Sequence, residues 1–339
     1  MRFFFRTVQV FVLKILVALL GFYIQVQLGR LLGMDGYGSF SLFLSLASVV
    51  SIFPLLGMDS GLIREVAAAD SFGKRKWCVL ISLSCSLLIL LMLGLIMPLI
   101  FPRLASSLSL PVDMLSLLIL YLAVLVLNTL AGAVLQGEQR NVLNDGTIAL
   151  TSFCKVIVIY ILSQYGVGLY EVLLSYIVLE LICTLGRWGN ILYRYKDIDI
   201  AWQSLLIAKN YIGYCLPLFF VSSIGVVQCS LHRFVTACFM DTYSVGILRV
   251  CENFSGALSL FVAPFVTTWP LMAVYYKERR LDDIKNMFKW SSVLITAMIM
   301  PALTTVTVCA SELLSWFNLS TSENQSLALV LFVFCLGTV

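Results

Sequence analysis

The chain has 339 residues, of which 60% are hydrophobic and 12% are charged, and its formal net charge at pH 7 is +4. Because roughly 25% of the residues in an ordinary soluble domain are charged, this composition excludes such a domain and indicates a surface solvated mostly by lipid. The positive charge lies in short breaks between apolar stretches, so it reports orientation in a membrane, and we expect no nucleic-acid partner.

Apolar runs of membrane-spanning length follow one another along the chain. A transmembrane helix needs roughly 20 apolar residues. The first six such runs cover residues 8–28, 39–56, 77–100, 115–135, 148–162 and 170–185. Four more cover residues 212–234, 245–270, 290–310 and 327 to the last residue. The pattern predicts an all-α polytopic membrane protein with about ten transmembrane helices.

The basic residues between these runs fall on alternate sides of the membrane. If the N-terminus is cytoplasmic, the outer breaks hold only Arg30 and Arg103. The inner breaks then hold Arg2, Arg6, Arg64, Lys74, Arg75, Lys76, Arg140, Arg187, Arg194, Lys196, Lys209, Lys277, Arg279, Arg280, Lys285 and Lys289. Basic residues near helix ends resist translocation. The bias therefore predicts a multi-pass protein with a cytoplasmic N-terminus.

A short motif occurs twice, after the first and after the seventh run. The first copy is Met34-Asp-Gly-Tyr-Gly38, and the second begins Met240-Asp-Thr-Tyr and reaches Gly246. Each copy precedes a run with an internal proline, Pro54 or Pro264. Because six spans separate the copies, the two halves cross the membrane in the same direction. We therefore expect a parallel duplication of a six-helix bundle.

The duplication defines two domains. Residues 1–193 form the first six-helix bundle, and residues 194–339 form a second bundle with four helices. A complete duplication would have twelve spans, so we expect the second bundle to be incomplete, as in a fragment or a truncated product.

Several glycine-rich and basic segments carry a family resemblance. They are Gly29-Arg-Leu-Leu-Gly33, Gly36-Tyr-Gly38, Leu56-Gly-Met-Asp-Ser-Gly61, Asp241-Thr-Tyr-Ser-Val-Gly246 and Tyr276-Lys-Glu-Arg-Arg280. With them the chain resembles the polysaccharide-transporter branch of the multidrug/oligosaccharidyl-lipid/polysaccharide (MOP) flippase superfamily, most closely the Wzx-type O-antigen flippases. The resemblance implies two helix bundles that face each other in a V around a central cavity.

The resemblance also implies a function and its partners. The implied activity moves an undecaprenyl-diphosphate-linked sugar unit between the leaflets of a bacterial inner membrane, for O-antigen and lipopolysaccharide biosynthesis. The implied partners are the lipid-linked oligosaccharide, membrane lipid and a polysaccharide polymerase of the same pathway.

Four basic residues lie inside predicted helices: Lys14, Lys155, Arg233 and Arg249. A charge at the bilayer centre costs about 2.5–3.5 kcal/mol on insertion scales, so such residues suggest a functional cavity. An Arg fork or Lys ammonium in a cavity binds a diphosphate through charge-assisted hydrogen bonds. We therefore expect all four to be substrate-binding cations of the cavity.

Three of these cations have a structural alternative. Lys14 shares a helical face with Ala18, Gly21 and Gln25, but it could instead snorkel to the membrane surface. Lys155 could form a buried pair with Glu180 on the next span.

Arg249 belongs to a polar stripe on the eighth span. Arg249, Glu252, Asn253 and Gly256 follow i, i+3, i+4, i+7 spacing. The structural alternative for Arg249 is a self-contained pair with Glu252. Glu180 and Glu252 are the acidic groups best placed for ion coupling, although pairing with the cations explains them as well.

Enzyme motifs are absent from the sequence. It has no phosphate-binding loop and no His-Glu-x-x-His motif, and its only histidine is His232. We expect no catalytic residue, no metal site and no cofactor. A cation-coupled multidrug exporter of the same superfamily is the alternative function, but it requires an acidic cavity. A membrane polymerase or glycosyl transferase requires a large polar loop, whereas the longest break covers only residues 187–210.

Overall fold

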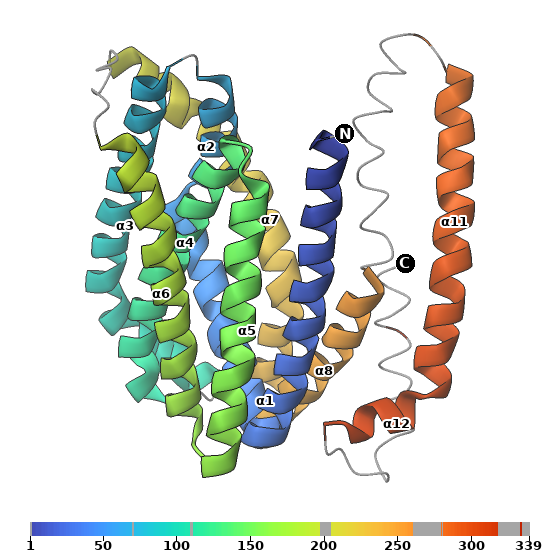
Figure 1. Cartoon of the computed structure of the whole chain (residues 1–339). Coiled ribbons are helices and arrows are strands. Elements are labelled where there is room, and N and C mark those ends of the chain that lie inside the picture. The colour runs from blue at the N-terminus through green and yellow to red at the C-terminus, as the bar shows by residue number, and fades with distance from the viewer. Residues whose placement is uncertain are drawn as a thin grey trace.

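The computed structural model describes residues 2–69, 71–108, 111–196, 205–259, 279, 281–317 and 333. Every regular element within these ranges is helical, which confirms the all-α prediction (Figure 1). In chain order the elements are α1 (Arg2–Leu55), α2 (Met58–Ala68), α3 (Phe72–Ser107), the 3-10 turn η1 (Val112–Met114), α4 (Leu115–Gly137), α5 (Asn141–Tyr165), α6 (Leu169–Tyr195), α7 (Leu205–Phe239), α8 (Thr242–Ser259), α11 (Leu281–Val308) and α12 (Ala310–Ser315).

Seven of the described helices are long and apolar enough to cross a membrane. The predicted runs up to residue 234 coincide with α1 and α3 to α7, and the run over residues 290–310 coincides with α11. The second half of the eighth run, the Pro264 position, the loop residues Lys277 and Arg280, and the final run apart from residue 333 lie outside the described residues.

Helix α1 contains the first two predicted spans. Gly33 interrupts it with φ 66° and ψ 175°, and the chain reverses direction there (Figure 1). This left-handed φ suits glycine, which has no Cβ to collide with the backbone. Pro54 removes a helix hydrogen bond near the other end, the helix stops at Leu55, and Gly57 leads into α2 with φ 70°.

Helices α1 to α6, called the first bundle below, carry apolar side chains both in their interior and on their outer surface. Its interior is filled by large aromatic and aliphatic residues such as Tyr37, Phe40 and Phe43, which are almost completely buried. On α3, Leu88, Leu91, Leu95 and Leu99 are instead exposed. Their spacing of three and four residues places them on one helical face. An apolar stripe that has no protein neighbour is expected where a helix faces lipid.

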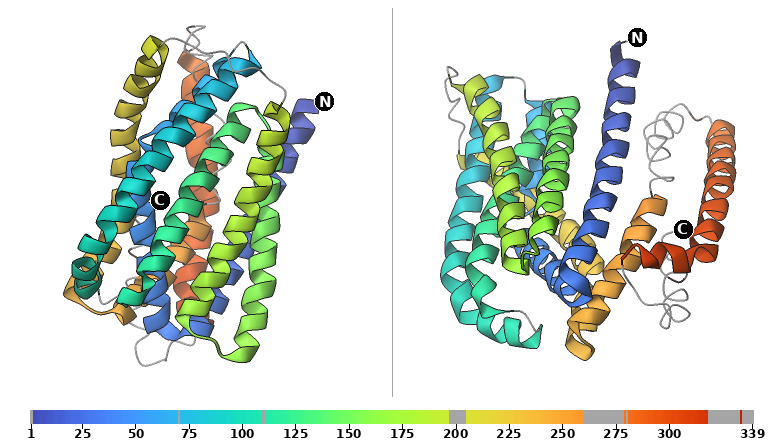
Figure 2. Two further views of the ribbon diagram at one scale, coloured as in Figure 1. Left: turned by 90° about the vertical axis from the view of Figure 1, so that its left-hand side faces the viewer. Right: turned by 60° about the horizontal axis from the view of Figure 1, so that its bottom comes forward.

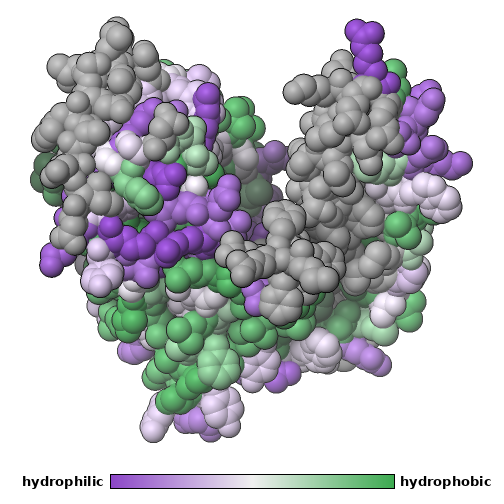
Figure 3. All heavy atoms as spheres, turned by 45° about the horizontal axis from the view of Figure 1, so that its top comes forward, coloured by the Kyte–Doolittle hydropathy of each residue, from purple (hydrophilic) through white to green (hydrophobic). Residues whose placement is uncertain are grey.

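Helices α8 and α11 lie on the far side of the N-terminal half of α1 from α4 and α6 (Figures 1 and 2). Hydrophilic side chains gather across one end of the first bundle, where α3 and α5 begin and α6 ends (Figure 3). Below them the flank of the bundle is mainly hydrophobic (Figure 3). This end carries several of the breaks that the sequence predicts to be basic.

The two copies of the repeated motif meet at the opposite end. A Cβ added to Gly38 would lie 1.9 Å from the Thr242 carbonyl oxygen, and one added to Gly246 would lie 2.3 Å from the Met34 carbonyl oxygen. Thr242 Oγ1 also donates a hydrogen bond of 3.1 Å to Asp35. Each copy therefore packs directly on the backbone of the other, and the contact needs a glycine in both.

Candidate functional site

A cavity of about 620 Å³ lies between α1, α8, α11 and α12. Two predicted polar faces meet there. Helix α1 contributes Ala18, Gly21 and Gln25, and α8 contributes Arg249, Glu252, Asn253 and Gly256. The other lining residues are mostly apolar: Leu19, Phe22, Phe254, Thr305, Val306, Leu313 and Trp316. A mostly apolar cavity with a few convergent polar groups is typical of a ligand site.

Glu252 is the centre of an ionic cluster beside this cavity. The Arg233 guanidinium donates to both carboxylate oxygens of Glu252 at distances of 2.6–2.9 Å, and Arg249 Nη1 donates at 3.0 Å. His232 Nε2 also pairs with Glu252. Two guanidinium groups against one carboxylate leave one positive charge even with a neutral His232. The cluster therefore favours an anion in the cavity.

A buried tyrosine connects α1 to α8 next to this cluster. Tyr37 donates a hydrogen bond of 2.7 Å to Gln25, and Asn253 donates one of 2.7 Å to the Tyr37 hydroxyl. Tyr37 is fully buried, whereas Gln25 and Asn253 line the cavity. The hydrogen bonds hold two amide side chains at the cavity wall, where they can bind hydroxyl groups.

Aromatic rings form another part of the wall. The ring centroids of Phe22 and Phe254 are 5.4 Å apart, and those of Phe22 and Trp316 are 6.4 Å apart, both in edge contacts. Arg30 Nε donates a hydrogen bond of 2.5 Å to the Trp316 carbonyl oxygen, which ties α12 to the turn in α1. Polar groups and aromatic faces thus lie within one cavity.

Lys155 lies in a different place, inside the first bundle. Its Nζ is 2.5 Å from Glu180 Oε1 and 3.5 Å from the centroid of the Tyr176 ring. Glu180 also accepts a hydrogen bond of 3.0 Å from Asn128. The lysine side chain is only 7% exposed. The structure therefore has the buried Lys155–Glu180 pair that was the structural alternative, and neither residue lines the cavity at α8.

Arg187 extends this polar network, although its position in the sequence predicted a basic residue of an inner break. That prediction is wrong, because α6 continues to Tyr195 and buries Arg187 to 3% exposure. Its guanidinium donates to Asn128 at 2.7 Å, to Thr147 at 2.8 Å and to the Asn144 carbonyl at 3.0 Å. The spacing of Glu180, Thr184 and Arg187 on one helical face was the available signal.

The four predicted cavity cations therefore have different surroundings. Arg249 lines the cavity, and Arg233 contacts Glu252 from α7 without lining it. Lys14 is exposed and is not among the lining residues, although Ala18, Gly21 and Gln25 of its face are. Sequence reasoning did not assign a role to Tyr37 or to His232; the repeated motif contains the former, and the latter is the only histidine.

No group of three or more His, Cys, Asp or Glu side chains within the described ranges could hold a metal ion.

Several solved MATE structures have a similar fold. One, described as the inward-facing conformation of a multidrug resistance MATE family transporter of the MOP superfamily, aligns with a TM-score of 0.72 at 15% identity, over 95% of this chain and 78% of that one. A MATE protein in complex with MaD3S aligns with a TM-score of 0.65 at 15% identity, over 98% and 78%. The MATE transporter DinF-BH in complex with R6G gives 0.61 at 12% identity, over 96% and 76%.

The fold defines the class: an all-α, multi-pass membrane protein whose fold is similar to that of the solved MATE proteins. The family model for polysaccharide biosynthesis proteins matches residues 7–276, and the chain belongs to this family. No individually curated protein is significantly similar to it.

Proposed function

We propose that this protein is a flippase that moves an undecaprenyl-diphosphate-linked oligosaccharide across the bacterial inner membrane. Its cargo would be a repeat unit of O-antigen or of another surface polysaccharide. The observation that carries the proposal is the surplus positive charge at the cavity, where Arg233 and Arg249 share the single carboxylate of Glu252. A diphosphate is the complementary ligand. The family description, a polysaccharide biosynthesis protein, supports a sugar as the rest of the cargo.

Each part of the cavity then has a role. Arg249 would bind the diphosphate, while Gln25 and Asn253 would donate and accept hydrogen bonds with sugar hydroxyl groups. The apolar lipid tail would stay in the bilayer. Moving the headgroup neither makes nor breaks a covalent bond, so the site needs no nucleophile and no general base.

Glu252 offers a way to couple this binding to an ion. While it is ionised, the carboxylate holds both guanidinium groups. Protonation or cation binding at Glu252 would weaken these bonds and free the arginines for an anionic headgroup. Glu180 is the second candidate for ion coupling, but its carboxylate contacts Lys155 and Asn128.

Alternating access requires two halves of the protein and two conformations, one closed on the outer side of the membrane and one closed on the inner side. We propose that the halves are residues 1–193 and 194–339, and that the N-terminus is cytoplasmic. The arginines at the hydrophilic end of the first bundle, Arg75, Arg140 and Arg194, support this orientation (Figure 3). The contact of Gly38 with Thr242 and of Gly246 with Met34 would then close the outer side. An inward-facing state is further supported by the TM-score of 0.72 to a transporter described in that conformation.

A cation-coupled multidrug exporter is the alternative, and the fold of the solved neighbours favours it. The charge of the cavity opposes it, because a cationic drug would meet the surplus positive charge and would find Glu252 already bonded to Arg233 and Arg249. A polysaccharide polymerase of the same pathway remains a proposed partner, which would use the flipped product.

Complementation tests the proposal. The chain, alone or extended by two C-terminal helices of a close relative, is expressed in a host whose O-unit flippase gene is deleted. We expect restored polysaccharide laddering on a gel with the wild type and none with Arg249→Gln at equal membrane abundance. Full laddering by an Arg233→Gln/Arg249→Gln protein would contradict the anion site, and failure of both wild-type forms would contradict the function. Lowered rhodamine 6G accumulation in the same cells would favour the exporter.

A further inference from the structure

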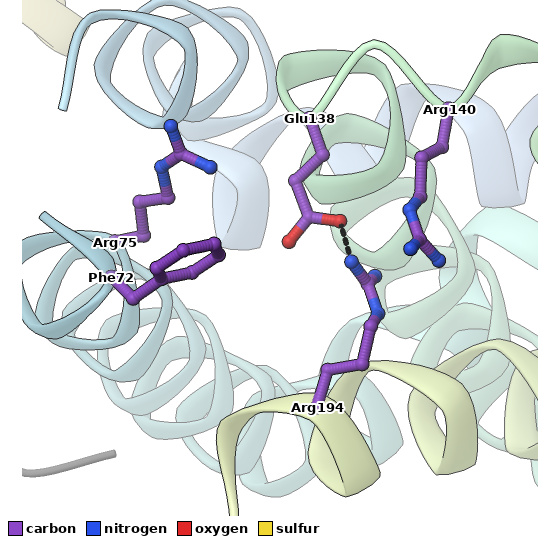
Figure 4. Close-up of a pocket in the computed structure, with 5 residues that line it drawn as sticks. All are labelled: Phe72, Arg75, Glu138, Arg140 and Arg194. Carbon is purple, nitrogen blue, oxygen red and sulfur yellow. Dashed lines mark ion pairs between the residues drawn. The ribbon is translucent and has the colours of Figure 1, made fainter. Parts of the chain in front are cut away.

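A second polar cavity lies at the hydrophilic end of the first bundle, far from α8. Its volume is about 490 Å³, and Phe72, Arg75, Glu138, Arg140 and Arg194 line it. These residues come from the start of α3, the α4–α5 turn and the end of α6. Figure 4 shows Arg140 and Arg194 on one side of Glu138, with Phe72 and Arg75 across the opening. Three arginines from three separate segments thus converge on one space.

The cavity has a surplus of positive charge. Three guanidinium groups and one carboxylate leave two positive charges among the lining residues. The carboxylate is already engaged, because Glu138 pairs with Arg194 and accepts a hydrogen bond of 2.6 Å from the Tyr195 hydroxyl. Asp70 and Asp197 lie outside the described residues, so this sum covers the lining residues alone.

Two guanidinium N–H groups at this cavity have no hydrogen-bond acceptor among the described residues. Arg75 Nε and Arg194 Nη2 are buried and make no hydrogen bond to a described residue. Leaving a buried donor without an acceptor is unfavourable, and more so when the group is charged. Helices α3 and α5 also begin here without an acidic residue in the first turn, so no carboxylate within that turn offsets the positive end of either helix dipole. The oxygens of an anionic group in the cavity could accept hydrogen bonds from these arginines and offset the helix dipoles.

We propose that this cavity binds the phosphate group of an anionic phospholipid headgroup at the membrane surface. Basic pockets between transmembrane helices are suited to such headgroups. The surroundings fit a lipid, because Phe72 is 56% exposed and Leu192 and Tyr193, next to Arg194, are 62% and 82% exposed. A zwitterionic headgroup is disfavoured, because its ammonium would meet the two surplus positive charges.

A free phosphate or diphosphate has the same chemistry, but the exposed apolar side chains around the arginines favour the lipid source. The site is separate from the cavity between α1 and α8. The proposal therefore holds for any cargo that the protein transports.

Native mass spectrometry of the purified full chain tests the proposal with two added lipids, phosphatidylglycerol and phosphatidylcholine of equal chain length. We expect the wild type to prefer phosphatidylglycerol. Arg75 and Arg140 would each donate a charge-assisted hydrogen bond to the headgroup phosphate, so Arg75→Gln/Arg140→Gln should lose at least about tenfold in phosphatidylglycerol affinity. The matched control is Lys285→Gln/Lys289→Gln, which removes two exposed charges from the start of α11.

The lysine control should keep the wild-type preference. Equal losses in the two double variants, or no preference in the wild type, would overturn the proposal. Protection of the wild type against thermal unfolding by millimolar inorganic phosphate or diphosphate, without selective lipid binding, would identify a free phosphate as the ligand and also overturn it. If the arginine double variant does not fold, Arg140→Gln alone serves, because the Arg140 side chain is exposed and makes no hydrogen bond to a described residue; it should still lose affinity.

Discussion

Two ionic clusters inside the helical part of the protein are built from similar residues but have different surroundings. The first-bundle network of Lys155, Glu180, Asn128 and Arg187 links α4, α5 and α6, and each of its charged groups has a hydrogen-bond partner. The α8 cluster of Arg233, Arg249 and Glu252 adjoins a cavity of about 620 Å³ and has more cations than anions. Each cluster has two cations and one anion, so neither the type of charged residue nor the charge balance identifies a site; access to a cavity does.

The largest expected effect is on stability and concerns the first-bundle network. Glu180→Ala leaves Lys155 buried without its carboxylate, and breaking a buried ion pair costs about 3–5 kcal/mol. We expect a clear loss of thermal stability of the detergent-solubilised protein. A Lys155→Met/Glu180→Leu protein should recover most of it, because an apolar pair of similar volume leaves no unpaired charge. A stable Glu180→Ala protein without transport would instead assign Glu180 to the transport cycle.

The second prediction concerns the glycine contact between α1 and α8. This contact supports the α8 cluster but not the first-bundle network. Gly246→Ala places a Cβ 2.3 Å from the Met34 carbonyl oxygen, so α8 must move away from α1. Overpacking of this kind costs about 1–3 kcal/mol. We expect transport to be lost while the first-bundle network stays intact, and hydrogen exchange should rise in α8 and not in α5.

Gly225→Ala on α7 is the matched control, because Gly225 does not line the cavity and a Cβ there meets no described atom within 4 Å. Equal loss of transport in both variants would argue against the glycine contact as a closing device.

The third prediction tests the anion preference of the α8 cluster. Arg249→Gln removes one charge that lines the cavity, while Arg233 keeps its bonds to Glu252. A hydrogen bond to a charged group contributes about 1.5–3 kcal/mol, so binding of the diphosphate lipid should weaken by roughly tenfold to a hundredfold. Thermal stability should change little.

Arg249→Lys keeps the charge but lacks the planar fork. It should therefore show an intermediate loss in a binding assay with purified protein. Wild-type affinity in Arg249→Gln would remove Arg249 from the headgroup site.

Whether the sequence alone predicts a feature depends on how far apart in the chain its residues lie. Apolar runs and their breaks are local, so the all-α membrane fold followed from them, and the stripe of Arg249, Glu252 and Asn253 followed from helical spacing. Contacts between distant segments were harder to predict. The bond from Tyr37 to Asn253 spans 216 positions, and that from Arg233 to Ser45 spans 188. Arg187 was missed because a helix end was placed too early.

The smallest expected effect is at the start of α8, outside the membrane-spanning part. Asp241 precedes the helix. Hydrogen bonds from Ser244, first from its hydroxyl group and then from its backbone N–H at 2.9 Å, lower the pKa of the Asp241 carboxyl group. A folded-state pKa below the unfolded value means that the capping contribution is present above the unfolded pKa and is lost as pH falls through the folded one. The cap should therefore be constant near neutral pH and should weaken only in acid.

We expect Asp241→Asn to remove this acid dependence with little change at pH 7, because an amide oxygen still caps a helix. The stability that the cap gives is measured by hydrogen exchange in the first turn of α8, compared between the wild type and the variant at each pH. The difference should change only as the carboxyl protonates in acid. A pH-independent difference would mean that the Asp241 carboxylate contributes no charge-dependent stability to α8.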